Sequence, residues 1–214
     1  MKKKETVASQ IANEIAMRIA KRMLHPNQHL VELAIAEEFK TSRAPVREAL
    51  LMLEKDRLVE KIPHRGFVVR QFSKSEIHQL YDATFRLEEI AMQKAIHNVT
   101  QSDIAALEDI LEKQREAIGN NDTVSYYDFN EQFHAYILFI AGNQFITEMH
   151  QSLRRSSRPL SLLNMGQGNN MSLSYEEHTR QFRALQTKDL SSGIQAIRDQ
   201  EARSLKTLDI FYPE

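Results

Sequence analysis

Two arginines that stand four residues apart, Arg43 and Arg47, are the first residues of this sequence whose types and spacing could do chemistry. On a helix this spacing sets both side chains on neighbouring parts of one face. A planar guanidinium can donate two hydrogen bonds to the O6 and N7 atoms of guanine in the major groove of DNA. A lone arginine is usually a solvated surface charge. The pair therefore indicates DNA only if the right elements surround it.

A second set of polar residues lies far along the chain. Asn130 and His134 are four apart, so both project from one face of a helix. His178 lies on a later segment, Gln200 follows it by 22 residues, and Arg86 comes earlier among apolar neighbours. Neutral imidazole is a good ligand for transition metals, yet two histidines leave the coordination shell of a metal incomplete.

Two other pairs indicate structure rather than a site. His150 and Arg154 are four apart but have no matching partners in the sequence, which favours a solvated helix face. Met165 and Met171 are flexible apolar side chains, and they fit packing better than ligand binding.

The elements that surround Arg43 and Arg47 are three short helices followed by a hairpin. Apolar periodicity predicts helices over 1–24, 32–39 and 43–55, with Ser42 capping the third through its hydroxyl. Two short strands are predicted over 58–62 and 67–70, around the turn residues Pro63, His64, Arg65 and Gly66. This order is that of a winged helix-turn-helix, and it contains no catalytic constellation.

The remainder of the chain reads as helix almost throughout. Capping patterns at Ser73 and Ser174 each begin a predicted helix. The predicted helices cover residues 73–98, 100–119, 122–141, 143–165, 174–188 and 189–208, and Pro159 is expected to interrupt and kink the fourth. No parallel-sheet rhythm or phosphate-binding glycine loop is present. The fold class is therefore mostly α, with an N-terminal winged helix-turn-helix followed by an all-helical bundle.

Composition and charge narrow the classes further. The 214 residues include no cysteine, which excludes disulfides and thiolate metal sites, and 42% hydrophobic residues are enough for a real core. Residues 1–75 carry 15 Lys and Arg against 9 Asp and Glu, whereas the rest carries 13 against 20. A basic N-terminal third suggests a nucleic-acid reader. Neither a membrane helix nor an export signal follows the basic run Lys2–Lys4, so we expect a cytoplasmic protein with no membrane partner.

From Met23 to Ser73 the sequence resembles the DNA-binding domain of GntR-type bacterial regulators. The run SRAPVREALLMLEKDRLVEKIPHRGFVV is similar to the family pattern S-R-x-P-V-R-E-A-L, a leucine-rich stretch, and a wing that ends in R-G-x-x-V. Asn27 stands where the family usually has glycine, and Lys40 and Thr41 replace the usual Gly-Val of the turn. The Lys40 turn would be strained if its backbone needs a positive φ.

The resemblance implies which residues approach DNA. The start of the third helix would contact bases and backbone, and the wing tip would reach a phosphate or the minor groove. The residues concerned are Ser42, Arg43, Ala44, Arg47, His64, Arg65 and Gly66. The partner would be double-stranded DNA, bound by a homodimer on an inverted repeat.

Residues 74–208 resemble the FCD ligand domain of the FadR branch of the GntR family. That family places Asp and His four apart on one helix and two further histidines on the last two helices, around a divalent metal. This chain has Asn130 at the Asp position and Gln200 at the last His position, whereas His134 and His178 match. Arg86 would face an acidic effector near the metal. The implied cofactor is a zinc or nickel ion, weakened by the two amides.

Two alternatives to this degenerate metal site remain open. In one, Arg86, Asn130, His134, His178 and Gln200 hydrogen-bond an organic effector without a metal. In the other, they form a satisfied polar network in a bundle that only dimerises.

The sequence as a whole predicts two domains, 1–73 for DNA binding and 74–214 for effector binding and dimerisation. We expect a transcriptional repressor whose operator affinity is modulated by a small acidic effector. The alternative is a helical-bundle metalloenzyme with an appended DNA-binding domain, and the amides of Asn130 and Gln200 count against it.

Overall fold

The structure is a computed structural model that describes residues 6–213. Its contacts divide the chain into two compact units, Met1–Phe72 and Ser73–Glu214, and each is described by itself below. The basic run Lys2–Lys4 lies outside the described residues. Within residues 6–213, no helix is both long and apolar enough to cross a membrane.

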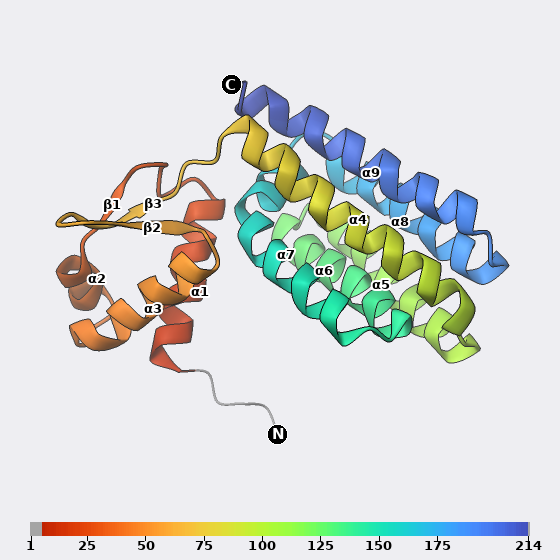
Figure 1. Ribbon diagram of the computed structural model, residues 1–214, viewed down its shortest axis with the longest axis horizontal. Helices are drawn as coiled ribbons and strands as arrows, with labels where there is room; N and C mark the ends of the chain where they lie inside the picture. Colours follow the sequence, from red (N-terminus) through yellow and green to blue (C-terminus); the bar gives the residue numbers. More distant parts are fainter. Residues whose placement is uncertain (1–5, 214) are drawn as a thin grey trace. The chain divides into compact units, whose positions relative to one another are not determined.

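The N-terminal unit is a winged helix-turn-helix (Figure 1). Its apolar core is formed by the inner faces of three helices and by the strands that follow. In chain order the elements are α1 (Val7–Ala20), β1 (His29–Leu30), α2 (Glu32–Glu38), α3 (Arg43–Lys55), β2 (Val59–Ile62) and β3 (Gly66–Val69).

The first predicted helix ends four residues early, at Ala20 instead of residue 24. Arg22 adopts a φ of 56°, and the N–H of Met23 donates to the carbonyl of Arg18 at 2.8 Å. This is the hydrogen-bond pattern that closes a helix with a left-handed residue. A local turn thus ends the helix although the apolar spacing continues to Met23.

The wing is a three-stranded antiparallel sheet in the order β1-β3-β2. The predicted hairpin is present, with Val59 opposite Val69 and Ile62 opposite Gly66. The strand β1 was not predicted, because two residues are too few to show a periodicity.

Several turns of this unit place a side chain in left-handed backbone conformation. Lys40 has a φ of 50°, so the strain foreseen for this turn is present. Asn27, which replaces a usual glycine, has a φ of 63°, a value that asparagine tolerates better than most residues. At the wing tip His64 and Gly66 have φ values of 62° and 80°.

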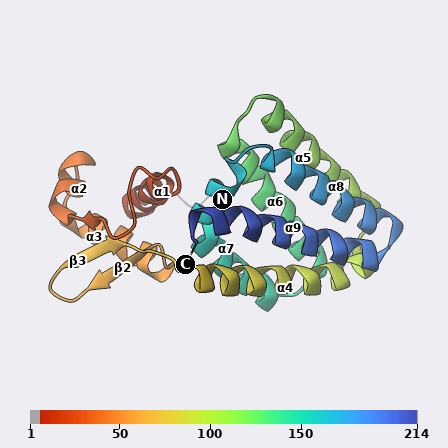
Figure 2. The same cartoon turned by 90° about the horizontal axis from the view of Figure 1, so that it is seen from above.

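The second unit is a bundle of helices in which α6 packs against α4, α5, α7 and α8 (Figure 2). In chain order the helices are α4 (Lys74–Asn98), α5 (Gln101–Gly119), α6 (Thr123–Ala141), α7 (Gln144–Met165), α8 (Asn170–Thr187) and α9 (Leu190–Phe211). Most of the surface of α6 is buried against these helices, and an exposed stripe of Asp128, Gln132, Ala135 and Phe139 runs along its remaining side. Polar residues on α6 can therefore face the interior.

The helices of the bundle begin at the capping residues predicted from the sequence, with one exception. Ser73 begins α4 with a complete capping box, as predicted. The cap predicted at Ser174 is wrong, because α8 begins at Asn170 and Ser174 lies one turn inside it, buried. The same Ser-x-x-Glu spacing also fits a helix interior, so the pattern alone did not fix the boundary. Pro159 does not break α7, which runs continuously from Gln144 to Met165, and the kink expected at Pro159 stays a prediction.

Candidate DNA-reading surface and bundle pocket

The residues expected to approach DNA are all exposed on the N-terminal unit. They come from the start of α3 and from the β2–β3 turn, and they are Ser42, Arg43, Ala44, Arg47, His64, Arg65 and Gly66. The opposite face of α3 is buried through Val46, Ala49, Leu50 and Leu53, which fixes the direction in which the two arginines point. The unit thus presents cations to solvent from a rigid element.

Arg43 and Arg47 share one acidic neighbour that sequence reasoning missed. The carboxylate of Glu32, in the first turn of α2, accepts from Arg43 Nη2 at 2.9 Å and lies 4.0 Å from Arg47 Nε. Both arginine side chains remain more than half exposed, whereas Glu32 is largely covered. Glu32 therefore restricts where the guanidinium groups point without hiding them.

The predicted capping hydrogen bond of Ser42 is absent. Ser42 is the N-cap residue of α3, but its hydroxyl makes no cap hydrogen bond. A capping side chain usually accepts from the second or third residue of the helix, and the third is Pro45, which has no N–H. The hydroxyl of Ser42 and the start of α3 consequently remain available to a phosphate group.

Inside the bundle the structure brings together Asn130, His134, His178 and Gln200, the four residues predicted from α6, α8 and α9. All four side chains are buried, with 0–4% of their surface exposed. The imidazole rings of His134 and His178 lie 5.0 Å apart between centroids, in an edge-to-face arrangement. The sequence predicts that these four positions lie close together inside the bundle, and the structure places them there.

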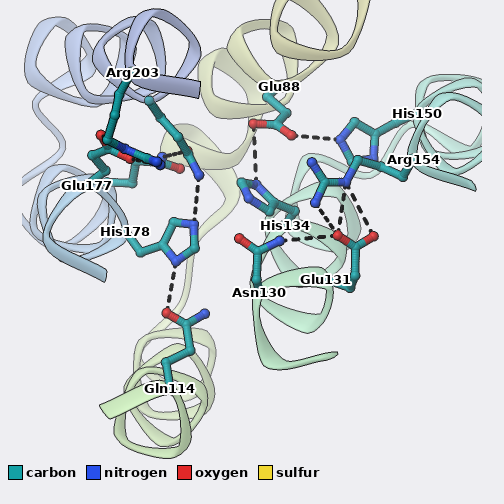
Figure 3. A network of polar contacts seen from close by, with 12 residues as sticks. Glu88, Gln114, Asn130, Glu131, His134, His150, Arg154, Glu177, His178 and Arg203 are labelled. Atoms are coloured by element: carbon teal, nitrogen blue, oxygen red, sulfur yellow. Dashed lines mark hydrogen bonds and ion pairs between the residues drawn. The ribbon is translucent and has the colours of Figure 1, made fainter. Parts of the chain in front are cut away.

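The hydrogen bonds of His178 define its proton position (Figure 3). Gln200 Nε2 lies 3.1 Å from His178 Nε2, and an amide nitrogen can only donate, so this imidazole nitrogen accepts. The proton is then on Nδ1, which donates to Gln114 Oε1 at 2.9 Å. Gln181 Nε2 donates to Gln200 Oε1 at 2.9 Å and holds the amide of Gln200 in this orientation.

His150 is part of the interior as well, so the solvated face predicted for it is wrong. It is 3% exposed, and its Nε2 lies 2.8 Å from Glu88 Oε1. The other oxygen of Glu88 lies 3.3 Å from His134 Nδ1 (Figure 3). The partner of His150 is 62 residues away on α4, and a local pattern could not reveal it.

Arg154 was predicted to be solvated and is instead 8% exposed. Its guanidinium bonds the carboxylate of Glu131, with Nε 3.0 Å from Oε1, and Glu131 also accepts from the amide of Asn130 at 3.2 Å. A second buried ion pair joins Arg203 on α9 to Glu177 on α8, with two contacts of 2.8 Å. Both guanidinium groups border the interior site, and sequence reasoning missed the second one altogether.

Arg86 is not brought to this site. Its side chain is 46% exposed and forms ion pairs with Asp82, Glu89 and Glu201 on the surface shared by α4 and α9. The apolar neighbours expected from the sequence lie on the other face of α4, where Tyr81 and Phe85 are buried.

Burial keeps both imidazoles of the site neutral. It lowers the pKa of His178 to about 3, and the nearby guanidinium groups of Arg203 and Arg154 act in the same direction. Burial also lowers the pKa of His134 well below its usual value, together with His178, Arg154 and His150. At neutral pH each ring therefore has one donor and one acceptor nitrogen.

The donor set does not fit a resident divalent metal. Gln200 donates to the very nitrogen of His178 that a metal would need, and Asn130 supplies a neutral amide in place of a carboxylate. In the part of the chain that the structure describes, no three His, Asp or Glu residues are grouped so as to hold a metal ion. The arrangement instead suits hydrogen bonding to an uncharged or anionic group.

Unpartnered polar atoms mark the interior of the bundle. The buried atoms Tyr126 OH, Asn130 Oδ1, His134 Nε2 and Ser174 Oγ make no hydrogen bond among the described residues. Glu88 Oε2 makes none either, although His134 Nδ1 lies 3.3 Å from it. Leaving such a group unpaired costs about 1–3 kcal/mol. Asn130 and Ser174 line a small cavity of about 20 Å³, together with Arg154, Gln200, Arg203 and others. That volume holds roughly one water molecule.

Comparison with known proteins matches a family model to each of the two units. A family model for the FCD domain matches residues 79–200, and a model for bacterial regulatory proteins of the gntR family matches residues 7–69. The gluconate operon transcriptional repressor of Bacillus subtilis (strain 168) is 26% identical over 201 residues, 91% of this chain and 82% of that protein. The HTH-type regulator McbR of Escherichia coli (strain K12) is 28% identical over 144 residues, 67% of this chain and 65% of that protein.

Solved structures agree in fold. Escherichia coli McbR/YncC has a TM-score of 0.80 at 24% identity, over 97% of this chain and 99% of that one. A GntR regulator from Rhodococcus sp. RHA1 has a TM-score of 0.72 at 21% identity, over 93% of this chain and 97% of that one. These relatives support a DNA-binding regulator and give no support to the metalloenzyme alternative.

Proposed function

Because this chain belongs to the GntR family of bacterial regulatory proteins and carries an FCD domain, we propose that it represses transcription under the control of a small effector. It is a DNA-binding transcriptional regulator and not an enzyme. In the proposal the N-terminal unit reads an operator, and an effector held by the bundle changes the affinity for that operator. The setting is the cytoplasm, where the chain meets DNA.

The exposed start of α3 supports the reading of DNA. Arg43 and Arg47 project from a helix whose other face is buried, and the wing tip presents Arg65 beside Gly66. One recognition helix reads too few bases to select a unique site. A homodimer with twofold symmetry would read an inverted repeat, with one α3 in each half-site.

The observation that supports an effector most strongly is the group of unpartnered polar atoms around Asn130 and His134. A satisfied structural network would leave few such atoms, because each of them lowers stability. Arg154 and Arg203 line the same cavity, and each is paired with an acid, so an acidic effector would compete with Glu131 or Glu177 for a guanidinium group. Asn130, His134, His178 and Gln200 would supply the neutral hydrogen bonds once the cavity of about 20 Å³ has opened to admit the effector.

The direct test is selection of an operator from random double-stranded DNA, followed by titration with the selected sequence. We expect an inverted repeat. Arg47→Ala should weaken binding to it by about 1–3 kcal/mol for each guanine contact that is lost. Arg115→Ala is the matched control, since it removes an exposed arginine from the bundle helix α5. The assignment of α3 is wrong if Arg47→Ala binds the operator as the unmodified chain does.

A further inference from the structure

A cleft on the outside of the bundle, between α6 and α7, has a volume of about 310 Å³. This is the lower end of the range that small organic ligands occupy. Its walls combine the apolar surfaces of Tyr127, Ala135 and Leu138 with three guanidinium groups, those of Arg154, Arg155 and Arg158. The interior cavity described above holds roughly one water molecule as it stands, whereas this cleft already has room for a small organic ligand. A second cleft of about 310 Å³, lined in part by Arg180, Arg183 and Asp189, lies between α8 and α9.

Arg158 in this cleft has unused hydrogen-bonding capacity. Its guanidinium carbon lies 5.7 Å from the centre of the Tyr127 ring, a distance that allows a cation–π interaction. Its Nε is buried and has no hydrogen-bond acceptor among the described residues. A buried donor of this kind is costly unless it finds an acceptor. A ligand with a carboxylate would supply one.

Two acids border the cleft, and neither accepts a hydrogen bond from Arg158 Nε. Glu131 is bonded to Arg154, with contacts of 3.0 and 3.3 Å to Arg154 Nε. Burial raises the pKa of the Asp128 carboxyl group, while the charge of Arg158 lowers it. The buried Nε of Arg158 is therefore the donor that the cleft offers to an anion.

Arg154 connects the cleft with the interior site. It lines both the cleft and the small cavity that contains Asn130 and Gln200. Its partner Glu131 accepts from the amide of Asn130 (Figure 3). An anion that drew Arg154 away from Glu131 would therefore change the hydrogen bonding of Asn130.

We propose that the α6–α7 cleft binds an organic anion that has a carboxylate and a short apolar or aromatic body. Arg158 donates to the carboxylate, and Tyr127 and Leu138 contact the body. Binding of the anion changes the hydrogen bonding of Asn130 through Arg154 and Glu131. Binding of the anion in this cleft does not require the chain to bind DNA. An effect of the anion on operator affinity rests on the proposed function.

The test uses 4-fluorobenzoate as the probe and follows its ¹⁹F resonance as the intact protein is added. We expect binding of 4-fluorobenzoate and at least tenfold weaker binding of the neutral isostere 4-fluorobenzamide. Arg158→Gln should weaken benzoate binding at least tenfold, whereas the matched variant Arg183→Gln, an exposed arginine on α8, should leave it unchanged.

A second variant protects the test against misfolding. Ala135 is exposed within the cleft, so Ala135→Phe fills the space without entering the core, and it should also block the probe. The proposal is overturned if 4-fluorobenzoate does not bind at about 10 mM, or if the amide binds equally well. It is also overturned if neither Arg158→Gln nor Ala135→Phe weakens binding.

Operator titrations separate this proposal from the proposed function. If the chain selects no operator but binds the probe through Arg158, the cleft stands and the proposed function fails. If it binds an operator but not the probe, only the cleft fails. Where both hold, 4-fluorobenzoate should shift operator affinity in the unmodified chain and leave that of Ala135→Phe unchanged.

Discussion

The two units of this molecule treat polar groups in opposite ways. On the N-terminal unit the arginines of α3 are exposed, and among the residues that the structure describes Glu32 is the acid that restrains them. In the bundle, Arg154 and Arg203 are each held by an acid, and the imidazoles beside them are neutral. Under the proposed function, this difference would correspond to two kinds of partner. A large polyanion such as DNA is bound by exposed cationic side chains. A small ligand is bound by a few oriented hydrogen-bond donors and acceptors that are shielded from water.

The bundle also differs from the domain it resembles. At two positions where the FCD family places metal ligands, this chain has Asn130 and Gln200, and Gln200 occupies the acceptor nitrogen of His178. Gln200 bonds to Gln181 and His178, whereas Asn130 donates to Glu131. Neither amide gives the charge compensation that a carboxylate would give to a metal. The same helices can thus support a site of different chemistry.

The largest effect is expected when the bundle is returned to the family pattern. Asn130→Asp combined with Gln200→His adds a carboxylate and a third imidazole to His134 and His178. We expect zinc or nickel to bind on the order of 100-fold more tightly than to the unmodified chain, or about 2.7 kcal/mol. Metal content and calorimetric titration after chelator treatment measure this. Equal tight binding by both proteins would contradict the view that the amides prevent coordination.

The buried imidazoles should make the stability of the bundle depend on pH. Because burial lowers the pKa of His178 from 6.5 to about 3, the unfolded chain binds more protons than the folded chain between these values. The free energy of unfolding therefore falls as pH falls through this range, by up to about 1.4 kcal/mol per pH unit for one histidine. His178→Gln should reduce this slope.

Denaturant unfolding between pH 7 and pH 4 measures that slope. His97→Gln is the control, because His97 is an exposed histidine of the same unit. An unchanged slope in His178→Gln would show that this imidazole does not become charged on unfolding.

On the N-terminal unit, Glu32→Gln should lower the ratio of operator affinity to random-DNA affinity by roughly 3- to 10-fold, about 1 kcal/mol. The reason is that the hydrogen bond from Arg43 is weakened when its acceptor loses its charge, while the loss of a negative charge strengthens binding to any DNA. Glu37→Gln removes the same charge from an exposed position on α2 and serves as the control. If both variants change the ratio equally, Glu32 acts only through its charge.

The smallest effect is expected at Arg86. Since its partners are Asp82, Glu89 and Glu201 on the bundle surface, Arg86→Ala should lower the free energy of unfolding by no more than about 1 kcal/mol. Binding of 4-fluorobenzoate should be unaffected. A variant of unchanged stability that no longer binds the probe would place Arg86 at a ligand site instead.

The sequence predicted most helices because their boundaries depend on local chemistry. Ser73, Thr100, Asp122 and Asn143 each accept a hydrogen bond from the first turn of the helix that follows, and all four starts were predicted. The recognition helix was predicted to the residue for a different reason, since its motif fixes both its apolar face and its exposed arginines.

The buried network could not be predicted in the same way. His178 bonds to Gln114 across 64 residues, and Arg203 bonds to Glu177 across 26, so no local spacing relates these residues. His150 and Arg154 were taken as solvated because their partners Glu88 and Glu131 lie on other helices. Arg86 shows the reverse error, since apolar residues nearby in sequence lie on the opposite face of α4.

The account depends most on the state of the two imidazoles in the bundle. Long-range ¹H–¹⁵N NMR of the histidine side chains reports which ring nitrogen carries a proton and whether the ring is charged. We predict that His134 and His178 are neutral at pH 6, and that His178 carries its proton on Nδ1 while Nε2 accepts from Gln200. Adding one equivalent of zinc should leave these resonances unchanged. A charged ring, or a zinc-dependent shift of the Nε2 resonance of His178, would contradict the account.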